Sequence, residues 1–174
     1  MSSGATEAEK ATLFTQSDKY IVVSRLFLKL LALVYLAAFA SLATQIAALA
    51  GSGGIYPLQT QLDLYADLSW PLRLAHYPSV FWLGASDIAL QSAAWLGCAL
   101  TFLVLLGHFA RTALILLFVL YLSLFHAGQI FMNFQWDYLL LEAGFLAIFL
   151  NGGGRTIVWL YRFVLFKLRF LSGI

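Results

Sequence analysis

Apolar residues along the chain fall into five long stretches, which short polar or glycine-rich segments separate. The first stretch includes 21 consecutive uncharged residues, 30–50. As an α-helix they would extend about 31 Å, enough to cross a hydrocarbon core of about 30 Å. The pattern therefore predicts an all-α integral membrane protein, a bundle of four to five transmembrane helices. The expected spans are residues 26–50, 80–106, 112–131, 135–150 and 156–172.

Two polar segments lie outside these stretches. Residues 1–19 are small, polar and mixed in charge, which predicts a disordered cytosolic tail before a transmembrane domain of residues 20–174. Residues 51–79 contain all three prolines of the chain between scattered leucines and tyrosines. We expect this segment to form a loop with a short helix at the membrane surface.

The fourth apolar stretch is too short to cross a membrane alone. Only 13 residues separate Asp137 from Asn151, which corresponds to about 20 Å of helix. Either the helix begins upstream and draws Asn133, Gln135 and Asp137 toward the bilayer, or it spans part of the depth beside its neighbours. Both alternatives predict that polar side chains meet the helix bundle at this corner.

Composition excludes several function classes. Of 174 residues, 62% are hydrophobic and 10% are charged, and the mean hydropathy is +0.88, whereas soluble domains carry about 25% charged residues. This excludes a soluble globular enzyme, and ten Lys and Arg spread along the chain are too few for a nucleic-acid binder. The single cysteine, Cys98, excludes an intrachain disulfide. Since the sequence has no catalytic or cofactor motif, we expect neither enzyme activity nor a cofactor.

Basic residues set the expected orientation of the chain. Lys19, Arg25 and Lys29 flank the start of the first span, and later connecting segments alternate between basic and acidic or neutral. Because cytoplasmic ends of spans carry the excess of Lys and Arg, the N-terminus is predicted to be cytosolic.

The last apolar stretch has two interpretations. Arg155, Arg162 and Arg169 recur every seven residues and therefore lie within about 40° of one another on a helix, while apolar residues fill much of the remaining circumference. A helix lying on the cytosolic interface fits this pattern. A fifth span also fits, with the arginine stripe facing the bundle or a water-filled cleft.

Polar residues in the second span are candidates for a functional site, because such residues are costly in a membrane and usually face the bundle interior. Asp87, Gln91 and Trp95 follow one another at four-residue steps. The alternative is that Asp87 lies near the outer interface, where it caps the helix or is solvated. About 160° away lies a ridge of small residues that permits close helix packing. This ridge consists of Ala85, Ala89, Ala93 and Gly97.

The third span contributes His126, Gln129 and Asn133, which line one stripe if the helix continues that far. A lone intramembrane histidine is more often a hydrogen-bonded structural residue than a ligand. His76 and His108 lie in different loops, so no second histidine has a metal-ligand spacing and we expect no metal site.

The densest polar cluster lies between Gly128 and Leu150. Asp137, next to Gln135 and Trp136, is well placed to cap the helix that follows and to complement its dipole. Glu142 lies five residues further into an apolar helix, where an ionised carboxylate needs a partner. A protonated Glu142 is the alternative. The candidate partners are Arg155, Arg162, His126 and Gln129.

This cluster resembles the lipase maturation factor family. The resemblance is carried by FQWD at 134–137, LLLE at 139–142 and GFLA at 144–147, after Gly128-Gln129. It extends to YLAAFASLATQIAALAGSGGIYP at 35–57, Asp87 with LQ at 90–91, WLG at 95–97, and RFVLFKL at 162–168 with Ser172-Gly173.

The resemblance implies a polytopic membrane protein without a catalytic centre that assists folding and assembly of secreted homodimeric lipases. It implies the endoplasmic reticulum membrane in an animal, and we expect the inner (plasma) membrane in a bacterium. The expected partners are the lipid bilayer and a secreted lipase. Family members continue into a large non-cytosolic region, so the chain corresponds to the N-terminal transmembrane part, as a fragment or a truncated relative. That topology favours a fifth span.

An intramembrane enzyme or transporter subunit is the alternative function. It would use Asp87, His126 and Glu142, ionisable groups on three different spans. A transporter is expected to contain pseudo-symmetric repeats, and we find none in the sequence.

Overall fold

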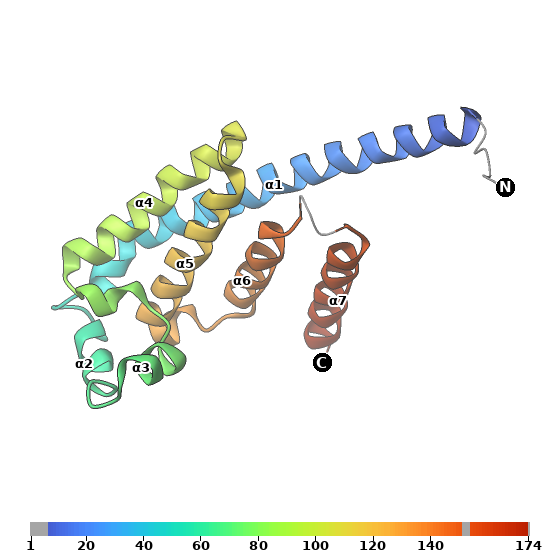
Figure 1. Cartoon of the computed structure of the whole chain (residues 1–174). Coiled ribbons are helices and arrows are strands. Elements are labelled where there is room, and N and C mark those ends of the chain that lie inside the picture. Colours follow the sequence, from blue (N-terminus) through green and yellow to red (C-terminus); the bar gives the residue numbers. More distant parts are fainter. Residues whose placement is uncertain (1–6, 151–153, 174) are drawn as a thin grey trace.

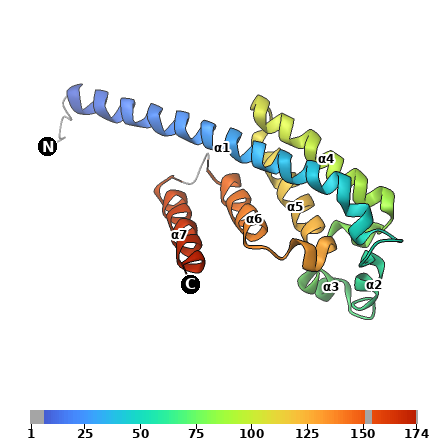
Figure 2. The same cartoon turned by 180° about the vertical axis from the view of Figure 1, so that it is seen from behind.

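A long N-terminal helix organises the fold in the computed structural model, which describes residues 7–150 and 154–173, with side chains from 22 to 150 and from 156 to 171. Helix α1 runs from Glu7 to Ala50, and its C-terminal half packs along α4, Asp87–Leu106 (Figure 1). Its N-terminal half extends beyond the other helices, as Figure 2 shows from behind. Residues 7–19, expected as part of a disordered tail, are therefore the first turns of α1.

Within the described part of the chain, three helices are long and apolar enough to cross a membrane: Val22–Ala50 within α1, α4, and Ala110–Met132. The third comprises α5, Ala110–Gly128, and the short 3-10 helix η2, Gln129–Met132. The described residues form helices and connecting turns and contain no strand. Many large apolar side chains on the outer surfaces are exposed, which suits a lipid solvent rather than water. The expected fold class, an all-α integral membrane protein, is confirmed.

Close packing of α1 against its neighbours depends on two glycines. A Cβ atom at Gly97 of α4 would lie 2.2 Å from the Phe39 ring, and one at Gly144 would lie 1.9 Å from the Tyr35 hydroxyl. Both aromatic side chains are completely buried. The small ridge of α4 thus faces α1, as the sequence indicates for Gly97 and Ala93, and it admits a ring where any larger side chain would collide.

The second expected span, 80–106, begins too early. Residues Val80–Leu83 form a 3-10 helix, η1, and α4 starts only at Asp87. The Ser86 hydroxyl accepts a hydrogen bond from the Ala89 amide at 3.2 Å and caps α4. Hydropathy alone did not reveal this cap, because the residues before it are apolar.

A small cap, residues 51–86, covers one end of the bundle. It contains α2, Leu58–Asp63, and α3, Trp70–His76, and α3 lies beside the C-terminal end of α5 (Figure 1). Two hydrogen bonds attach the cap to α5, from the Tyr77 hydroxyl to the His126 carbonyl at 2.7 Å and from the Val80 amide to the Ser123 hydroxyl at 3.0 Å.

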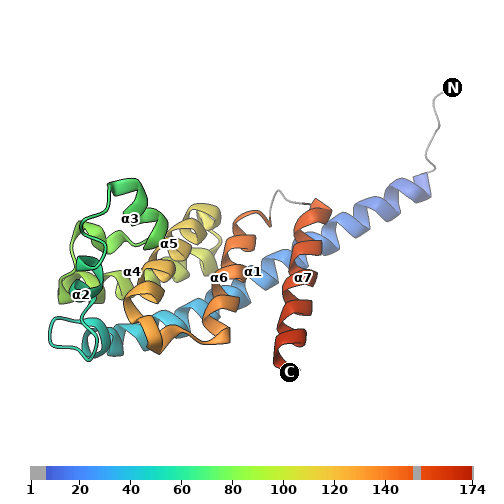
Figure 3. The same ribbon diagram turned by 90° about the horizontal axis from the view of Figure 1, so that it is seen from below.

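Two helices follow α5 and form an antiparallel pair. Helix α6, Gln135–Ile148, packs against α5, and α7, Gly154–Ser172, lies beside α6 (Figures 1 and 3). They coincide with the expected stretches 135–150 and 156–172. With 14 residues α6 is about 21 Å long and cannot cross a bilayer of about 30 Å by itself. The first turn of α6, which contains the buried Asp137, therefore lies inside the helix bundle and not at its end.

Candidate functional site: polar contacts between the membrane helices

A buried hydrogen bond joins α5 to α6. The Tyr121 hydroxyl donates to Asp137 Oδ1 at 2.7 Å, and the two residues are only 2% and 6% exposed. Asp137 is thus not the N-cap expected from the sequence, because Phe134, with extended backbone, has that position. The Asp137 carboxylate lies in the first helical turn, where its charge still suits the helix dipole, but it accepts from a neighbouring helix.

Helix α1 completes this contact with two aromatic rings. The Tyr121 ring lies 5.6 Å from Tyr35 and 5.5 Å from Phe39, both in edge-to-face geometry. The Tyr35 hydroxyl donates to the Leu140 carbonyl of α6 at 3.2 Å. We call Tyr35, Phe39, Tyr121 and Asp137 the tyrosine–aspartate junction. It ties α1, α5 and α6 together at their most buried point.

The polar stripe expected on the third span is interrupted. Gln129 has φ 48° and ψ −122°, a strained backbone for a residue other than glycine, so α5 ends at Gly128. His126, Gln129 and Asn133 therefore do not share a helical face. Asn133 instead accepts a short hydrogen bond from Tyr138, and Gln129 Nε2 is buried without a hydrogen-bond partner among the described residues.

Glu142 has a partner that the sequence analysis did not include. Lys167 of α7 donates a short hydrogen bond to Glu142 Oε1 and forms an ion pair with it. The proposed partners are wrong where the structure describes them. Arg162 lies 5.2 Å from the Trp159 ring on an exposed face, and His126 contacts a backbone carbonyl of its own helix. Gln129 makes no hydrogen bond to Glu142 among the described residues. The Arg155 side chain lies outside the described part.

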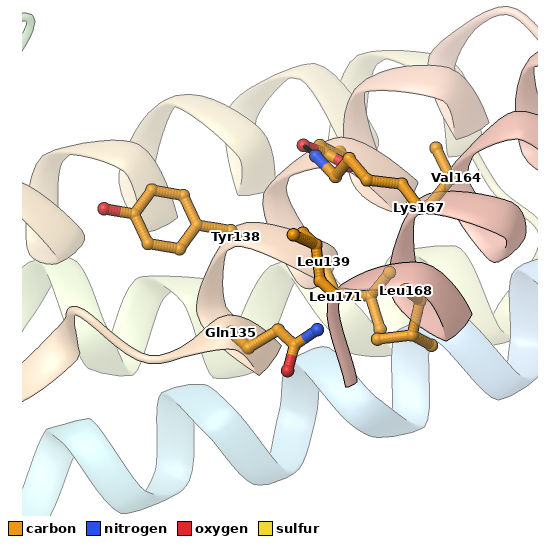
Figure 4. A pocket seen from close by; sticks show the side chains of 8 residues that line it. Gln135, Tyr138, Leu139, Val164, Lys167, Leu168 and Leu171 are labelled. Atoms are coloured by element: carbon orange, nitrogen blue, oxygen red, sulfur yellow. Dashed lines mark hydrogen bonds and ion pairs between the residues drawn. The ribbon is translucent and has the colours of Figure 1, made fainter. Parts of the chain in front are cut away.

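Between α6 and α7 lies a groove of about 280 Å³, which we call the α6–α7 groove (Figure 4). Its walls are the apolar side chains Leu139, Val164, Leu168 and Leu171. Gln135 and Tyr138 line the groove near the N-terminal end of α6. The Glu142–Lys167 pair lines it about 10 Å further along α6. Trp136 is exposed and stacks on Phe134 at 4.8 Å, outside this groove.

Asp87 binds the turn that follows α1. Its carboxylate accepts from the Ser52 amide at 2.6 Å and from the Ser52 hydroxyl at 2.8 Å. Asp87 is the first residue of α4 and is exposed, as are Gln91 and Trp95. This corresponds to the alternative in which Asp87 lies at the end of the span. The face bearing Gln91 and Trp95 points away from the described bundle.

His126 makes local backbone contacts. Its Nδ1 donates to the Leu122 carbonyl of its own helix at 2.8 Å, and its ring lies 5.1 Å from Tyr77 in the cap. Burial raises the pKa of the Tyr77 hydroxyl well above its usual range, so this hydroxyl remains a donor to the His126 carbonyl at any physiological pH. Among the described residues, no group of three or more His, Cys, Asp or Glu could hold a metal ion.

The sequence did not predict Tyr121 as the hydrogen-bond partner of Asp137, or Lys167 as the partner of Glu142. Tyr121 carries a hydroxyl in the middle of an apolar helix, and such a group needs a hydrogen-bond partner. Lys167 is the basic residue of α7 that lies off the arginine stripe, by roughly 120–160°. Both signals are present in the sequence, but neither identifies the partner.

The sequence of this chain matches a known protein family. Residues 22–174 match the lipase maturation factor transmembrane domain. Lipase maturation factor 2 of Gallus gallus is 38% identical over 169 residues, 86% of this chain and 24% of the relative. The Xenopus tropicalis relative of the same name is 36% identical over 81% of this chain and 23% of its own length. Lipase maturation factor 1 of Bos taurus is 30% identical over 84% of this chain and 30% of that protein. No solved structure matches.

Proposed function

Because this chain belongs to the lipase maturation factor family, we propose that it acts as the membrane part of a maturation or assembly factor that assists the folding of secreted lipases. The chain spans about a quarter of the length of the lipase maturation factor 2 relatives that it matches. The lipase client is therefore part of this proposal. The relatives are named as maturation factors rather than enzymes, which fits a role without a catalytic centre.

The observation that carries the proposal is the match over residues 22–174, which includes all four residues of the tyrosine–aspartate junction. The FQWD segment at 134–137 contains Asp137, and the YLAAF segment at 35–39 contains Tyr35 and Phe39. Segments of the chain that resemble the family thus meet at one buried contact. A rigid membrane scaffold built in this way suits a protein that positions a client.

We further propose that the N-terminus is cytosolic and that α7 crosses the membrane. Successive long helices are antiparallel neighbours, so α7 returns toward the end of the bundle where the cap lies. The Glu142–Lys167 pair supports a crossing, because it neutralises two charges at the depth of α6. The membrane would be the endoplasmic reticulum in a eukaryote and the plasma membrane in a bacterium.

The alternative function, an intramembrane enzyme or transporter subunit, requires Asp87, His126 and Glu142 to act together. The structure favours separate roles for them. Asp87 accepts hydrogen bonds from the turn after α1, His126 donates to a backbone carbonyl of its own helix, and Glu142 forms an ion pair with Lys167 of α7. No shared site joins the three among the described contacts, so these contacts do not support this function.

Co-purification with a client tests the proposal. The chain is co-expressed with a secreted homodimeric lipase, extracted in detergent and captured by an affinity tag. We expect lipase to be retained by the natural chain and reduced with Asp137→Ala, whose membrane level is matched by immunoblot. Leu165→Ala, at an exposed position of α7, is the control and should retain lipase fully. Recovery of no lipase with any of the three chains contradicts the proposal.

A further inference from the structure

We propose that the α6–α7 groove binds one molecule of an uncharged single-chain lipid, with its alkyl chain along the leucines and its hydroxyl or ester head at the Glu142–Lys167 pair. A monoacylglycerol has this chemistry. The inference is independent of the role in lipase maturation, because it rests only on the shape and polarity of the groove.

The size of the groove selects an extended chain. Its volume of about 280 Å³ is just below the roughly 300–1,000 Å³ of small-molecule pockets. A space this small suits a slender ligand better than a bulky one. An alkyl chain is narrow enough to lie between two helices.

The walls of the groove fit an alkyl chain rather than a polar molecule. Leu139 comes from α6, and Val164, Leu168 and Leu171 come from α7 (Figure 4). On the side away from Gln135, the two helices close on each other, since the Tyr161 hydroxyl donates to the Ala143 carbonyl at 2.8 Å. A chain anchored at the ion pair would therefore extend toward the N-terminal end of α6.

The polar end of the groove has unused hydrogen-bonding capacity. The Lys167 and Glu142 side chains are 41% and 35% exposed, and among the described residues their mutual contact is the only hydrogen bond of either side chain. Two ammonium hydrogens and Glu142 Oε2 are thus available to a ligand. A hydroxyl group accepts from the ammonium and donates to the carboxylate, so it satisfies both.

The charge of the pair selects an uncharged head group. One ammonium and one carboxylate sum to zero, so a bound phosphate or carboxylate would leave an uncompensated charge in an apolar groove, which is costly. A glycerol hydroxyl or an ester adds no charge. The groove therefore discriminates a monoacylglycerol from a fatty acid and from an anionic phospholipid.

Photolabelling of the full chain tests the site. The 174-residue chain, purified in detergent and placed in lipid nanodiscs, is irradiated with a monoacylglycerol that carries a diazirine in its chain and a terminal alkyne. Labelled peptides are mapped by mass spectrometry. We expect saturable labelling on α6 and α7, and unlabelled monoacylglycerol should compete it away. It should exceed labelling by a fatty acid and by a lysophosphatidic acid, a single-chain anionic phospholipid, with the same diazirine chain.

Variants separate a specific site from general contact with lipid. Leu168→Trp fills the groove and should abolish the saturable labelling, whereas Leu165→Trp on the exposed face of α7 should leave it unchanged. The double variant Glu142→Leu, Lys167→Met removes the polar end without leaving an unpaired charge. It should weaken apparent affinity about fivefold for each hydrogen bond lost.

Measurements on the natural chain keep the test decisive if a variant fails to fold. The proposal is overturned if labelling does not saturate, or if the exposed face of α4 near Ile88 and Phe102 is labelled as strongly as α6 and α7. Equal or stronger labelling by the fatty acid or the lysophosphatidic acid probe overturns the assignment of an uncharged head.

Discussion

The Tyr121 hydroxyl donates a 2.7 Å hydrogen bond to the buried carboxylate of Asp137. This contact links two helices across 16 residues of sequence, and it lies against the rings of Tyr35 and Phe39 on a third helix. A buried carboxyl group needs a hydrogen-bond partner, and the Tyr121 hydroxyl supplies it from the neighbouring helix.

Removal of that donor should destabilise the bundle. Tyr121→Phe leaves the Asp137 carboxylate buried without its hydrogen bond, and we expect a loss of about 1–3 kcal/mol in the free energy of unfolding. The measurement is the fraction of the chain that stays monodisperse in detergent after heating. Tyr138→Phe is the matched control, since Tyr138 is exposed and its partner Asn133 is also exposed. Equal losses for both variants would contradict the role of the junction.

Addition of one methyl group at Gly144 should disturb α1. The new Cβ of Gly144→Ala would meet the Tyr35 hydroxyl at 1.9 Å, and an overpacked core site costs about 1–3 kcal/mol. Gly84→Ala is the control, because nothing lies within 4 Å of its added carbon. Thermal stability in detergent should fall for the first variant only. A stable Gly144→Ala chain would show that α1 and α6 are not in close contact.

Charge reversal tests the pairing of α6 with α7. Lys167→Glu places two carboxylates together and should loosen α7, whereas the combined variant Glu142→Lys, Lys167→Glu should restore it. The effect is of the order of 1 kcal/mol, since both side chains are partly exposed. Limited proteolysis at the connection between the two helices measures it. Arg162→Glu, over the exposed Trp159, is the control. If the combined variant is no more protected than the single one, the two residues do not pair.

Loss of the Ser52 hydroxyl should weaken the turn between α1 and α4. Ser52→Ala removes one of two hydrogen bonds to Asp87 and keeps the backbone one, so we expect a loss of about 0.5–1.5 kcal/mol. Hydrogen exchange at the amides of residues 51–56 should accelerate. In the control Ser92→Ala, the lost bond is to the Ala89 carbonyl of the same helix, and exchange in this turn should not change.

Hydropathy predicted the helices well because apolar length is a property of each segment alone. The expected stretches 112–131, 135–150 and 156–172 overlap α5 with η2, α6 and α7, and the stretch 26–50 lies within α1. The start of α4 was misplaced by several residues, since η1 is as apolar as the helix that follows it. The part of α1 before residue 20 was also missed, because its polar composition resembles that of a disordered tail.

The candidate site could be predicted only in part. Asp137 and Glu142 stand out as charges in apolar helices, and both have partners. Their partners, Tyr121 and Lys167, lie 16 and 25 residues away on other helices. The spacing of residues within one helix shows which of them share a face, but it does not show which residues of another helix pack against that face. The positive φ of Gln129, which ends α5 and separates His126 from Asn133, likewise has no signature in the local sequence.

The central claim is that this membrane domain assists the maturation of a secreted lipase. The most direct measurement is the specific activity of lipase secreted by cells that lack their own maturation factor, with and without this chain. We predict that the natural chain raises activity per molecule of secreted lipase, that Leu165→Ala does so equally, and that Asp137→Ala at the same membrane level does so less. Unchanged specific activity with the natural chain would contradict the claim.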